Sequence, residues 1–189
     1  MSVVYFDFET TNLHTKSEIV GLGAVDDQGD EFHRYIIPRC PINLASSKRN
    51  GITKNGEAIF YKGVKIEDAV EPETGLEQFL NWLEGKNCKY LVAHNNSKFD
   101  KHIFKNNLKR FDFEVPEDLQ YVDSIDFVKK NFPDLRSRTL GRCLEYFLGE
   151  DQNETHNALD DAKDCKRICD AGAIRLDYDN FENYLENNK

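Results

Sequence analysis

The sequence predicts an α/β fold, and three of its features support this prediction. Residues 3–11 are rich in Val, Tyr and Phe, which favour a pleated strand. Residues 90–93 form a short, wholly apolar run, as expected of a strand that is covered on both faces. Several segments with helical spacing of apolar residues fill much of the rest of the chain. Strands and helices are therefore mixed along the chain.

The first three strands are expected to form a meander. Residues 18–25 are the second strand, residues 26–30 are a polar turn, and residues 31–37 return as the third strand. Pro38 and Pro41 end this meander. A short helix over residues 42–50, closed by Gly51, is expected next, followed over residues 58–66 by a small hairpin or a loop with strand character.

Helices are expected where apolar residues recur with the period of a helix. One such pattern lies before the apolar run at residues 90–93, and four follow it. The chain then ends in an acidic segment that can form one more, frayed helix. The expected ranges are residues 74–83, 98–110, 124–131, 139–148, 157–171 and 177–189.

Length and composition are typical of one globular domain over residues 1–189. Hydrophobic residues make up 39% of the chain, with 13 Phe and 8 Tyr, which is sufficient for a core. No apolar run approaches the length of a membrane span, and the N-terminus lacks the pattern of a signal peptide. We therefore expect an intracellular protein, cytoplasmic or nuclear, that is not secreted and has no membrane partner.

Cysteine usage and charge restrict the function further. The five cysteines are odd in number and contain no Cys-x-x-Cys pair, so they are expected to be free thiols in a reducing compartment. The formal net charge of -9 argues against non-specific coating of nucleic acid. It still permits a site that nucleic acid reaches through a local basic patch.

The first strand carries two acids on one of its faces. Because side chains alternate along a strand, Phe6 and Phe8 point one way, while Tyr5, Asp7 and Glu9 point the other. The two acids are about 7 Å apart along the strand, close enough to share a divalent cation. Such an ion would offset the cost of burying them. The alternative is a solvated strand end on which the acids have no special role.

A third acid, Asp100, follows the apolar run at residues 90–93. It lies in a loop that leaves the carboxyl end of a buried strand, which is where α/β sheets place ligands. The alternative is structural, because Ser97-x-x-Asp100 approximates a capping box at the start of the next helix. Both roles are compatible with the residues alone.

A histidine and a fourth acid lie close together near residue 160. On one continuous helix His156 and Asp161 would point about 140° apart. They can face one site only if His156 precedes the helix, with Asn157 or Thr155 as its N-cap. Asp161 falls within the apolar arc of this helix and Asp160 falls outside it, so Asp161 is the acid that needs a partner. A lone histidine before a helix is otherwise more often structural.

Three segments together resemble the exonuclease motifs of the DnaQ-like superfamily, in its DEDDh branch. Each motif is weak by itself, but three in the right order are a strong signal. The resemblance spans nearly the whole chain, and proofreading-subunit and three-prime repair exonucleases are the most similar types. The motifs are Asp7-Phe8-Glu9-Thr10-Thr11, His94-Asn95-Asn96-Ser97-Lys98-Phe99-Asp100 and His156-Asn157-Ala158-Leu159-Asp160-Asp161-Ala162.

Shorter segments add to this resemblance, and one position departs from it. Asn50-Gly51-Ile52-Thr53 is similar to a family segment after the third strand. Val122-Asp123-Ser124 and Arg138-Thr139-Leu140 are similar to the elements that precede the third motif. Asn12 stands where the family often has Gly, and Asn tolerates the left-handed backbone of such a turn. The Pro-rich loop of one repair-exonuclease subgroup is missing.

The resemblance implies a ribonuclease H-like fold, with a mixed five-stranded sheet flanked by helices. It also implies a metal-dependent 3′→5′ exonuclease that releases 5′-mononucleotides from nucleic acid 3′ ends. Two Mg²⁺ or Mn²⁺ ions per active site would clamp the scissile phosphate. Asp7, Glu9, Asp100 and Asp161 would hold these ions, and His156 would take a proton from the attacking water.

Residues that contact the substrate are also expected. Leu13 would act as a wedge between bases, and Arg138 would touch phosphates as part of a basic cluster with Lys129, Lys130, Arg136 and Arg142. A second basic cluster over residues 98–110 is more simply explained as a solvated helix face. The other residues expected at the terminal nucleotide are Phe8, Thr10, Thr11, Asn95 and Phe99.

Two classes of function are compatible with the sequence. The first is the exonuclease, with single-stranded DNA favoured over RNA as its partner and an exoribonuclease as the alternative. The second is a module of the same fold that binds nucleic acid or protein without catalysis. All four acids and the histidine are present, which favours the enzyme. A homodimer is a possible assembly.

Overall fold

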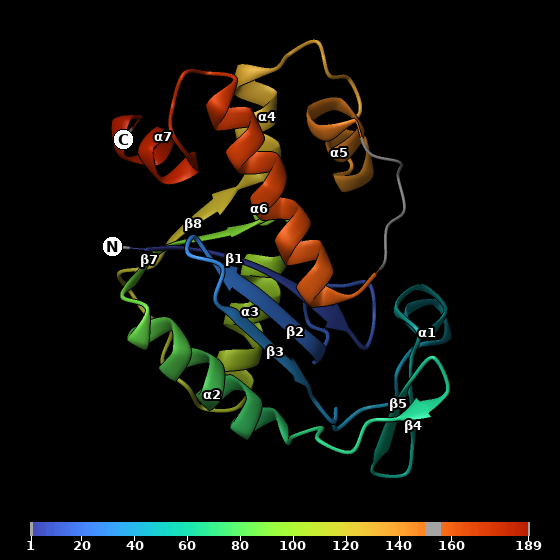
Figure 1. Ribbon diagram of the computed structural model, residues 1–189. Helices are drawn as coiled ribbons and strands as arrows, with labels where there is room; N and C mark the ends of the chain where they lie inside the picture. The colour runs from blue at the N-terminus through green and yellow to red at the C-terminus, as the bar shows by residue number, and fades with distance from the viewer. Residues whose placement is uncertain (1, 150–155, 189) are drawn as a thin grey trace.

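The computed structural model describes residues 2–149 and 156–188, and a mixed five-stranded sheet lies at its centre (Figure 1). Its strand order is β3-β2-β1-β7-β8. β1 pairs antiparallel with β2 and parallel with β7, β2 pairs antiparallel with β3, and β7 pairs parallel with β8. The predicted meander of the first three strands is confirmed. The strands are β1 (Ser2–Thr10), β2 (Ile19–Asp26), β3 (Glu31–Tyr35), β7 (Cys88–Ala93) and β8 (Gln120–Asp123).

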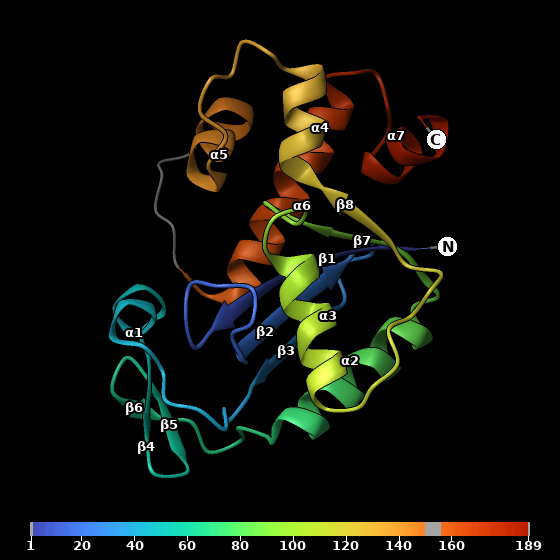
Figure 2. The same cartoon turned by 180° about the vertical axis from the view of Figure 1, so that it is seen from behind.

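Helices cover both faces of this sheet (Figures 1 and 2). Within the described part of the chain, two helices pack on one face and four on the other, which gives three layers. The pair on the first face is α2 (Pro72–Gly85) and α3 (Asp100–Arg110). The second face carries α4 (Ser124–Asn131), α5 (Leu140–Leu148), α6 (Ala158–Ile174) and α7 (Phe181–Asn187).

The alternation predicted for β1 distributes its side chains between these layers. Phe6 and Phe8 pack with Phe79 and Phe104 in the core beneath α2 and α3. Tyr5 packs in the other core, beneath α4 to α7. One strand therefore supplies both cores, as its period of two requires.

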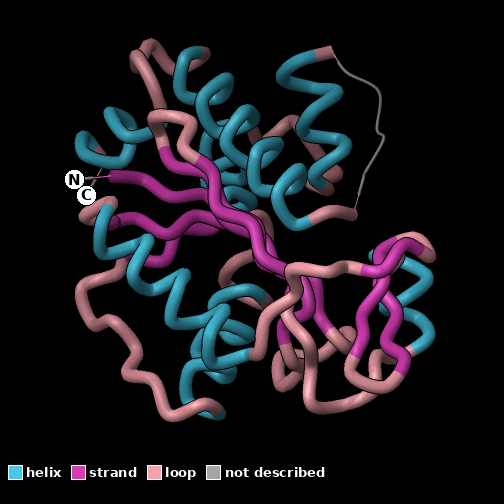
Figure 3. The backbone as a smooth tube through the Cα atoms, turned by 60° about the horizontal axis from the view of Figure 1, so that its bottom comes forward, coloured by secondary structure: helices cyan, strands magenta, loops and turns pink. Residues whose placement is uncertain are grey.

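A small second sheet lies beside helix α1 (Leu44–Asn50), away from the central sheet (Figure 3). It is formed by β4 (Ile52–Asn55), β5 (Ala58–Tyr61) and β6 (Val64–Lys65). The predicted hairpin is confirmed as β5 and β6, and the strand β4 was not predicted. Gly51, with a φ of 72°, ends α1 and leads into β4, a conformation that favours glycine.

The thiols of the chain are free, as predicted. Cys143, Cys165 and Cys169 are buried in the layer that α5 and α6 form against the sheet. Burial raises the pKa of the Cys143 thiol to about 11. Within residues 2–149 and 156–188, the longest helices are too short or too polar to cross a membrane.

Candidate active site

The carboxyl end of β1 brings two acids to the face of the sheet that α6 covers. Asp7 and Glu9 are half-buried there, and Asp161 approaches them from helix α6, which covers this face. Each of these three residues offers a carboxylate oxygen, and these oxygens all lie within 4.8 Å of one another. The acids therefore form a cluster of hard oxygen donors of the kind that Mg²⁺ or Mn²⁺ prefers.

The first turn of α6 delivers Asp161 to this cluster. The Asn157 side chain is the N-cap and accepts hydrogen bonds from the backbone N–H groups of Leu159 and Asp160. His156 precedes the helix with a φ of 48° and lines the same pocket as Asp161, which is the arrangement that the sequence required. Asp160 is exposed. The structure thus separates the two neighbouring acids as their places on the helix predicted.

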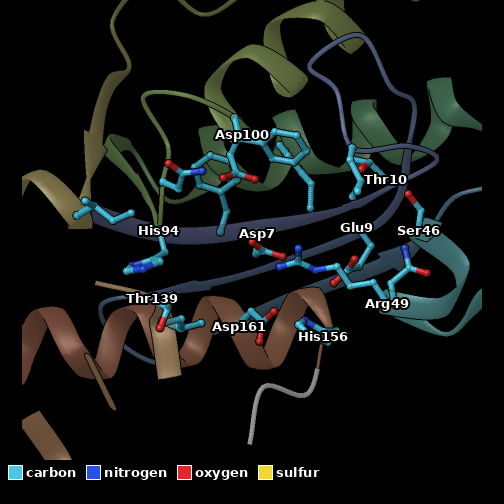
Figure 4. A pocket seen from close by; sticks show the side chains of 18 of the residues that line it. Asp7, Glu9, Thr10, Ser46, Arg49, His94, Asp100, Thr139, His156 and Asp161 are labelled. Atoms are coloured by element: carbon cyan, nitrogen blue, oxygen red, sulfur yellow. The ribbon is translucent and has the colours of Figure 1, made fainter. Parts of the chain in front are cut away.

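Asp100 approaches Asp7 from the opposite side (Figure 4). It is 3% exposed and is the first residue of α3. The capping-box interpretation is wrong, because Phe99 is the N-cap and makes no side-chain capping hydrogen bond. The backbone N–H of Ser97 donates instead to Asp123 Oδ2, at 2.8 Å. Asp100 therefore points into the pocket rather than serving its own helix as a capping-box partner.

Asp123, at the end of β8, fixes the loop that carries the second motif. Its carboxylate accepts from the backbone N–H groups of Asn95 (3.1 Å), Ser97 (2.8 Å) and Ile125 (2.9 Å). Asn95 has a φ of 72°, a left-handed conformation that Asn tolerates better than most residues. The loop thus places both Asn95 and Asp100 at the pocket.

The acids of the pocket resist ionisation. Burial raises the pKa of Asp7 well above its usual range, and the charges of Asp100 and Glu9 add to this. Burial and the Asp161 charge raise the pKa of Glu9 to about 8, against the opposing effects of the Asn50 side chain and the Arg49 charge. Burial also raises the pKa of Asp100 to about 7. A bound cation would remove this repulsion, so the site fits a divalent metal ion.

A pocket of about 680 Å³ contains these acids and most of the predicted substrate residues. Leu13 lies at its rim, with 57% of its surface exposed. Phe8 borders the pocket, but its ring is buried against the aromatic core. The other predicted substrate residues in the lining are Thr10, Asn95, Phe99 and Arg138.

Thr11 is the exception among the predicted substrate residues. It is 3% exposed and is absent from the residues that line this pocket. Its hydroxyl accepts a hydrogen bond from the backbone N–H of Glu18, at 3.1 Å. Its backbone carbonyl accepts another from Asn43, at 2.8 Å. Thr11 therefore closes the loop after β1, and its position does not support the expected contact with the terminal nucleotide.

Helix α1 supplies one wall of the pocket, which the sequence did not predict. Ser46, Arg49 and Asn50 line that wall, and Arg49 extends towards Glu9 (Figure 4). Asn50 belongs to the Asn50-Gly51-Ile52-Thr53 segment, which was the one signal that pointed to this region. The remaining lining residues that were not predicted as site residues are Phe6, His94, Ile125, Thr139 and Leu140.

His94 connects the second motif to the segment before α5. One ring nitrogen lies 2.7 Å from the Ser124 hydroxyl and the other lies 2.8 Å from the carbonyl oxygen of Arg138. Because that carbonyl can only accept, Nε2 of His94 is the donor. Among the described residues, none accepts a hydrogen bond from the buried Nε of Arg138. The backbone carbonyl of Arg138 is thus fixed by His94, while the Nε–H group of its side chain remains able to donate a hydrogen bond at the pocket.

Comparison with protein families and curated proteins gives a consistent result. The model of the exonuclease family RNase_T matches residues 4–169. The chain is 24% identical over 173 residues to the chloroplastic/mitochondrial exonuclease DPD1 of Arabidopsis thaliana, covering 85% of this chain and 52% of that protein. It is 26% identical over 174 residues to DNA polymerase III subunit epsilon of Buchnera aphidicola subsp. Baizongia pistaciae, covering 85% and 66%. The chain thus spans about half to two thirds of the length of these relatives.

Comparison with solved structures concerns the fold. E. coli exonuclease I in complex with a dA16 oligonucleotide superimposes with a TM-score of 0.73 at 16% sequence identity, covering 98% of this chain and 43% of that one. The zinc-bound complex of the same enzyme with single-stranded DNA gives a TM-score of 0.72 at 15% identity, with the same coverage. These matches confirm the ribonuclease H-like α/β fold.

Proposed function

The chain belongs to the exonuclease family of the RNase_T model, and on that premise we propose that it is a metal-dependent 3′→5′ exonuclease that degrades single-stranded DNA. One observation carries the proposal. One carboxylate oxygen from each of Asp7, Glu9 and Asp161 lies within 4.8 Å of the other two, in a pocket that Asp100 and His156 also line. These residue types are those that two-metal phosphodiester hydrolysis requires.

The acids would hold two Mg²⁺ or Mn²⁺ ions. When bound, such ions lower the pKa of water and stabilise the charge that develops on a phosphate during in-line displacement. Asp7, Glu9 and Asp161 form one group of ligands, and Asp100 approaches Asp7 from the other side (Figure 4). The raised pKa values of Asp7, Glu9 and Asp100 support this assignment, because two or more cations would relieve the repulsion among four acids.

His156 would accept the proton of the attacking water. It lies at the start of α6, five residues before Asp161, and lines the pocket beside it. An imidazole is suited to this role because its usual pKa lies near neutral pH. Attack from this side would release a 3′ oxygen as the leaving group, so the products would be 5′-mononucleotides.

The rest of the pocket would hold the end of the strand. Leu13, Asn95 and Phe99 would border the terminal nucleotide, with Leu13 as a wedge. Arg49 and Arg138 bring positive charge to the two sides of the pocket and would contact phosphates. A single strand would be preferred, because a duplex end must first unpair to enter. The free thiols support an intracellular protein, and we treat residues 1–189 as one exonuclease domain.

Matched DNA and RNA oligonucleotides with 5′ labels test this proposal. With Mg²⁺ or Mn²⁺, linear single-stranded DNA should shorten stepwise from its 3′-hydroxyl end and release 5′-mononucleotides. A chelator should stop the reaction, and Asp7→Ala should serve as an inactive control. Faster degradation of the RNA would identify an exoribonuclease instead.

Circular single-stranded DNA and product analysis complete the test. A circle has no 3′ end, so it should persist while the linear strand is consumed. Cutting of the circle at the same rate, or products that carry a 3′ phosphate, would contradict the assignment. Binding of DNA without hydrolysis under all metal conditions would support the non-catalytic alternative.

A further inference from the structure

Strand β2 lacks side chains at two positions next to the catalytic acids. Asp7 of β1 pairs with Gly23 of β2, and Gly23 pairs in turn with His33 of β3. Glu9 pairs with Gly21, which pairs with Tyr35. Residues that are directly opposite in neighbouring strands point to the same face of the sheet. The face under α6 therefore carries a bare strip on β2, with the acids on one side and two ring side chains on the other.

The first turn of α6 lies in this strip. A Cβ atom added to Gly23 would lie 2.1 Å from the backbone nitrogen of Leu159, 2.3 Å from the carbonyl carbon of Ala158 and 2.4 Å from the Cα atom of Leu159. These are backbone atoms at the start of a helix, so no side-chain rotation can relieve the contact. Gly23 thus permits an approach of helix to strand that any other residue would prevent.

The far wall of the strip also contacts the start of the helix. The His33 and Tyr35 rings pack edge to face, with centroids 4.7 Å apart. The amide nitrogen of Asn157 lies 3.5 Å from the Tyr35 hydroxyl, at the limit of a hydrogen bond. The side-chain oxygen Oδ1 of Asn157 accepts from the backbone N–H groups of Leu159 and Asp160, at 3.1 and 3.3 Å. The N-cap that begins the helix is therefore also in contact with β3.

The size of the displacement determines whether Asp161 can still reach the acids on β1. Ordinary contacts between carbon atoms begin near 3.5 Å, so a methyl group at residue 23 would push the helix start away by more than about 1 Å. Metal sites tolerate deviations of only about 0.2 Å in their distances, and catalytic constellations about 0.5 Å. Asp161 is two residues beyond Leu159 and moves with it. Such a shift is large enough to separate Asp161 from Asp7 and Glu9.

We propose that Gly23 and Gly21 form a seat on β2 that positions the metal site. Gly23 admits the first turn of α6 and thereby places Asp161 within reach of the acids on β1. Gly21 leaves room beside Glu9, since a Cβ atom there would lie 3.2 Å from the Glu9 Cβ and 3.5 Å from its Cγ. Both are positioning residues rather than catalytic residues. The inference rests on the proposed function, because it concerns the same metal site.

Thermal unfolding with and without Mn²⁺ tests the role of Gly23. A ligand that binds only the folded state raises its stability in proportion to the logarithm of its concentration over Kd. Mn²⁺ should therefore raise the Tm of the wild-type protein above its value in EDTA. Gly23→Ala should lose most of this Mn²⁺-induced shift, with an apparent Mn²⁺ affinity at least about tenfold weaker, as for other changes that misplace ligands.

Two other glycines provide matched controls. Gly172 lies near the other end of α6, where an added Cβ atom would meet the Phe127 ring at 2.7 Å. Gly172→Ala should lower the Tm in EDTA but leave the Mn²⁺-induced shift intact. Gly85 has nothing within 4 Å of an added Cβ atom. Gly85→Ala should leave the Mn²⁺-induced shift unchanged without loss of stability.

Gly21→Ala keeps the inference testable if Gly23→Ala does not fold. The neighbours of its added Cβ atom are the Cβ and Cγ atoms of Glu9 and the Cδ1 atom of Ile52, at 3.2 to 3.6 Å, so Glu9 must shift by a few tenths of an ångström. This variant should fold and bind Mn²⁺ several-fold more weakly. If Gly23→Ala and Gly21→Ala showed the same Mn²⁺-induced rise in Tm as the wild type, the proposed seat on β2 would be wrong. A wild-type protein that Mn²⁺ fails to stabilise would overturn the metal site itself, and this inference with it.

Discussion

The two faces of the central sheet are built from one strand but have opposite properties. On the face under α2 and α3, β1 contributes Phe6 and Phe8 to a cluster of buried apolar side chains. The Phe8 ring lies 5.9 Å from that of Phe104, in a cluster with Phe79. On the face under α6, the same strand contributes Tyr5 and then the acids Asp7 and Glu9. On the α2 and α3 face β1 therefore buries no charged side chain, whereas on the α6 face it brings together acids that repel one another when ionised.

Because side chains alternate along β1, its packing residues and its acidic residues point to opposite faces of the sheet. Buried apolar side chains stabilise the fold on both sides, but β1 contributes no acids on the α2 and α3 side. On the other side, raised pKa values show that the acids are costly to ionise without a cation. Substitutions on the two faces should therefore have opposite consequences, and three experiments test this expectation.

The largest effect is expected on the α6 face, at Asp161. Asp161→Asn should reduce the rate of hydrolysis by several orders of magnitude, because it removes a charged metal ligand from the cluster. Asp160→Asn should stay within a few-fold of the wild type, since Asp160 is exposed. Single-turnover rates at saturating Mg²⁺ measure both. Equal losses in the two variants would show that the metal site does not depend on this side of the helix.

A loss of stability without loss of chemistry is expected on the α2 and α3 face. Phe104→Ala should destabilise the fold by about 3–5 kcal/mol, as large-to-small changes in packed cores do. Phe104 is fully buried and contacts the rings of Phe8 and Phe79. Urea unfolding measures the loss, and kcat measured well below the Tm should stay within a few-fold. A collapse of kcat in the folded variant would show that the two faces are not independent.

The smallest effect concerns the pH dependence of the metal-free protein. The pKa of Glu9 is raised to about 8 and that of Asp100 to about 7, mainly by burial. These groups favour the folded state while protonated, so their contribution is complete below about pH 4 and is lost as the pH rises through 7 and 8. Stability in EDTA should therefore fall over this range, and Glu9→Gln should fall less. Urea titrations at several pH values measure this slope, and a steeper fall for Glu9→Gln would contradict the assignment.

Local patterns predicted much of the fold and the site. The alternation in residues 3–11 indicated which side chains of β1 meet α6, and the apolar arc of α6 indicated that Asp161 rather than Asp160 faces the sheet. The range of α4 was predicted as observed, Ser124–Asn131. These predictions succeeded because the period of a strand or helix determines the direction of a side chain.

Tertiary contacts account for what local patterns missed. β4 and β8 have four residues each, too few for a periodic signal. The capping-box interpretation of Asp100 failed because Asp123, more than twenty residues later, binds the backbone of Ser97. Ser46 and Arg49 reach the pocket because the tertiary fold brings α1 to one of its walls, which no local pattern reveals. The seat on β2 was not predicted either. The glycines of residues 18–25 suggested close packing, but no local pattern indicated that the start of α6 packs there.

The buried thiols beneath α6 make the motions of the site accessible to experiment. Cys165 and Cys169 belong to the helix that carries Asp161, and Cys143 belongs to its neighbour α5. Burial raises the pKa of Cys143 to about 11 and that of Cys169 well above its usual range, so these two thiols form few reactive thiolates while the helices stay packed on the sheet. Alkylation must then wait for the layer to open. The time course of that reaction would measure how often the helix separates from the sheet, with no introduced label.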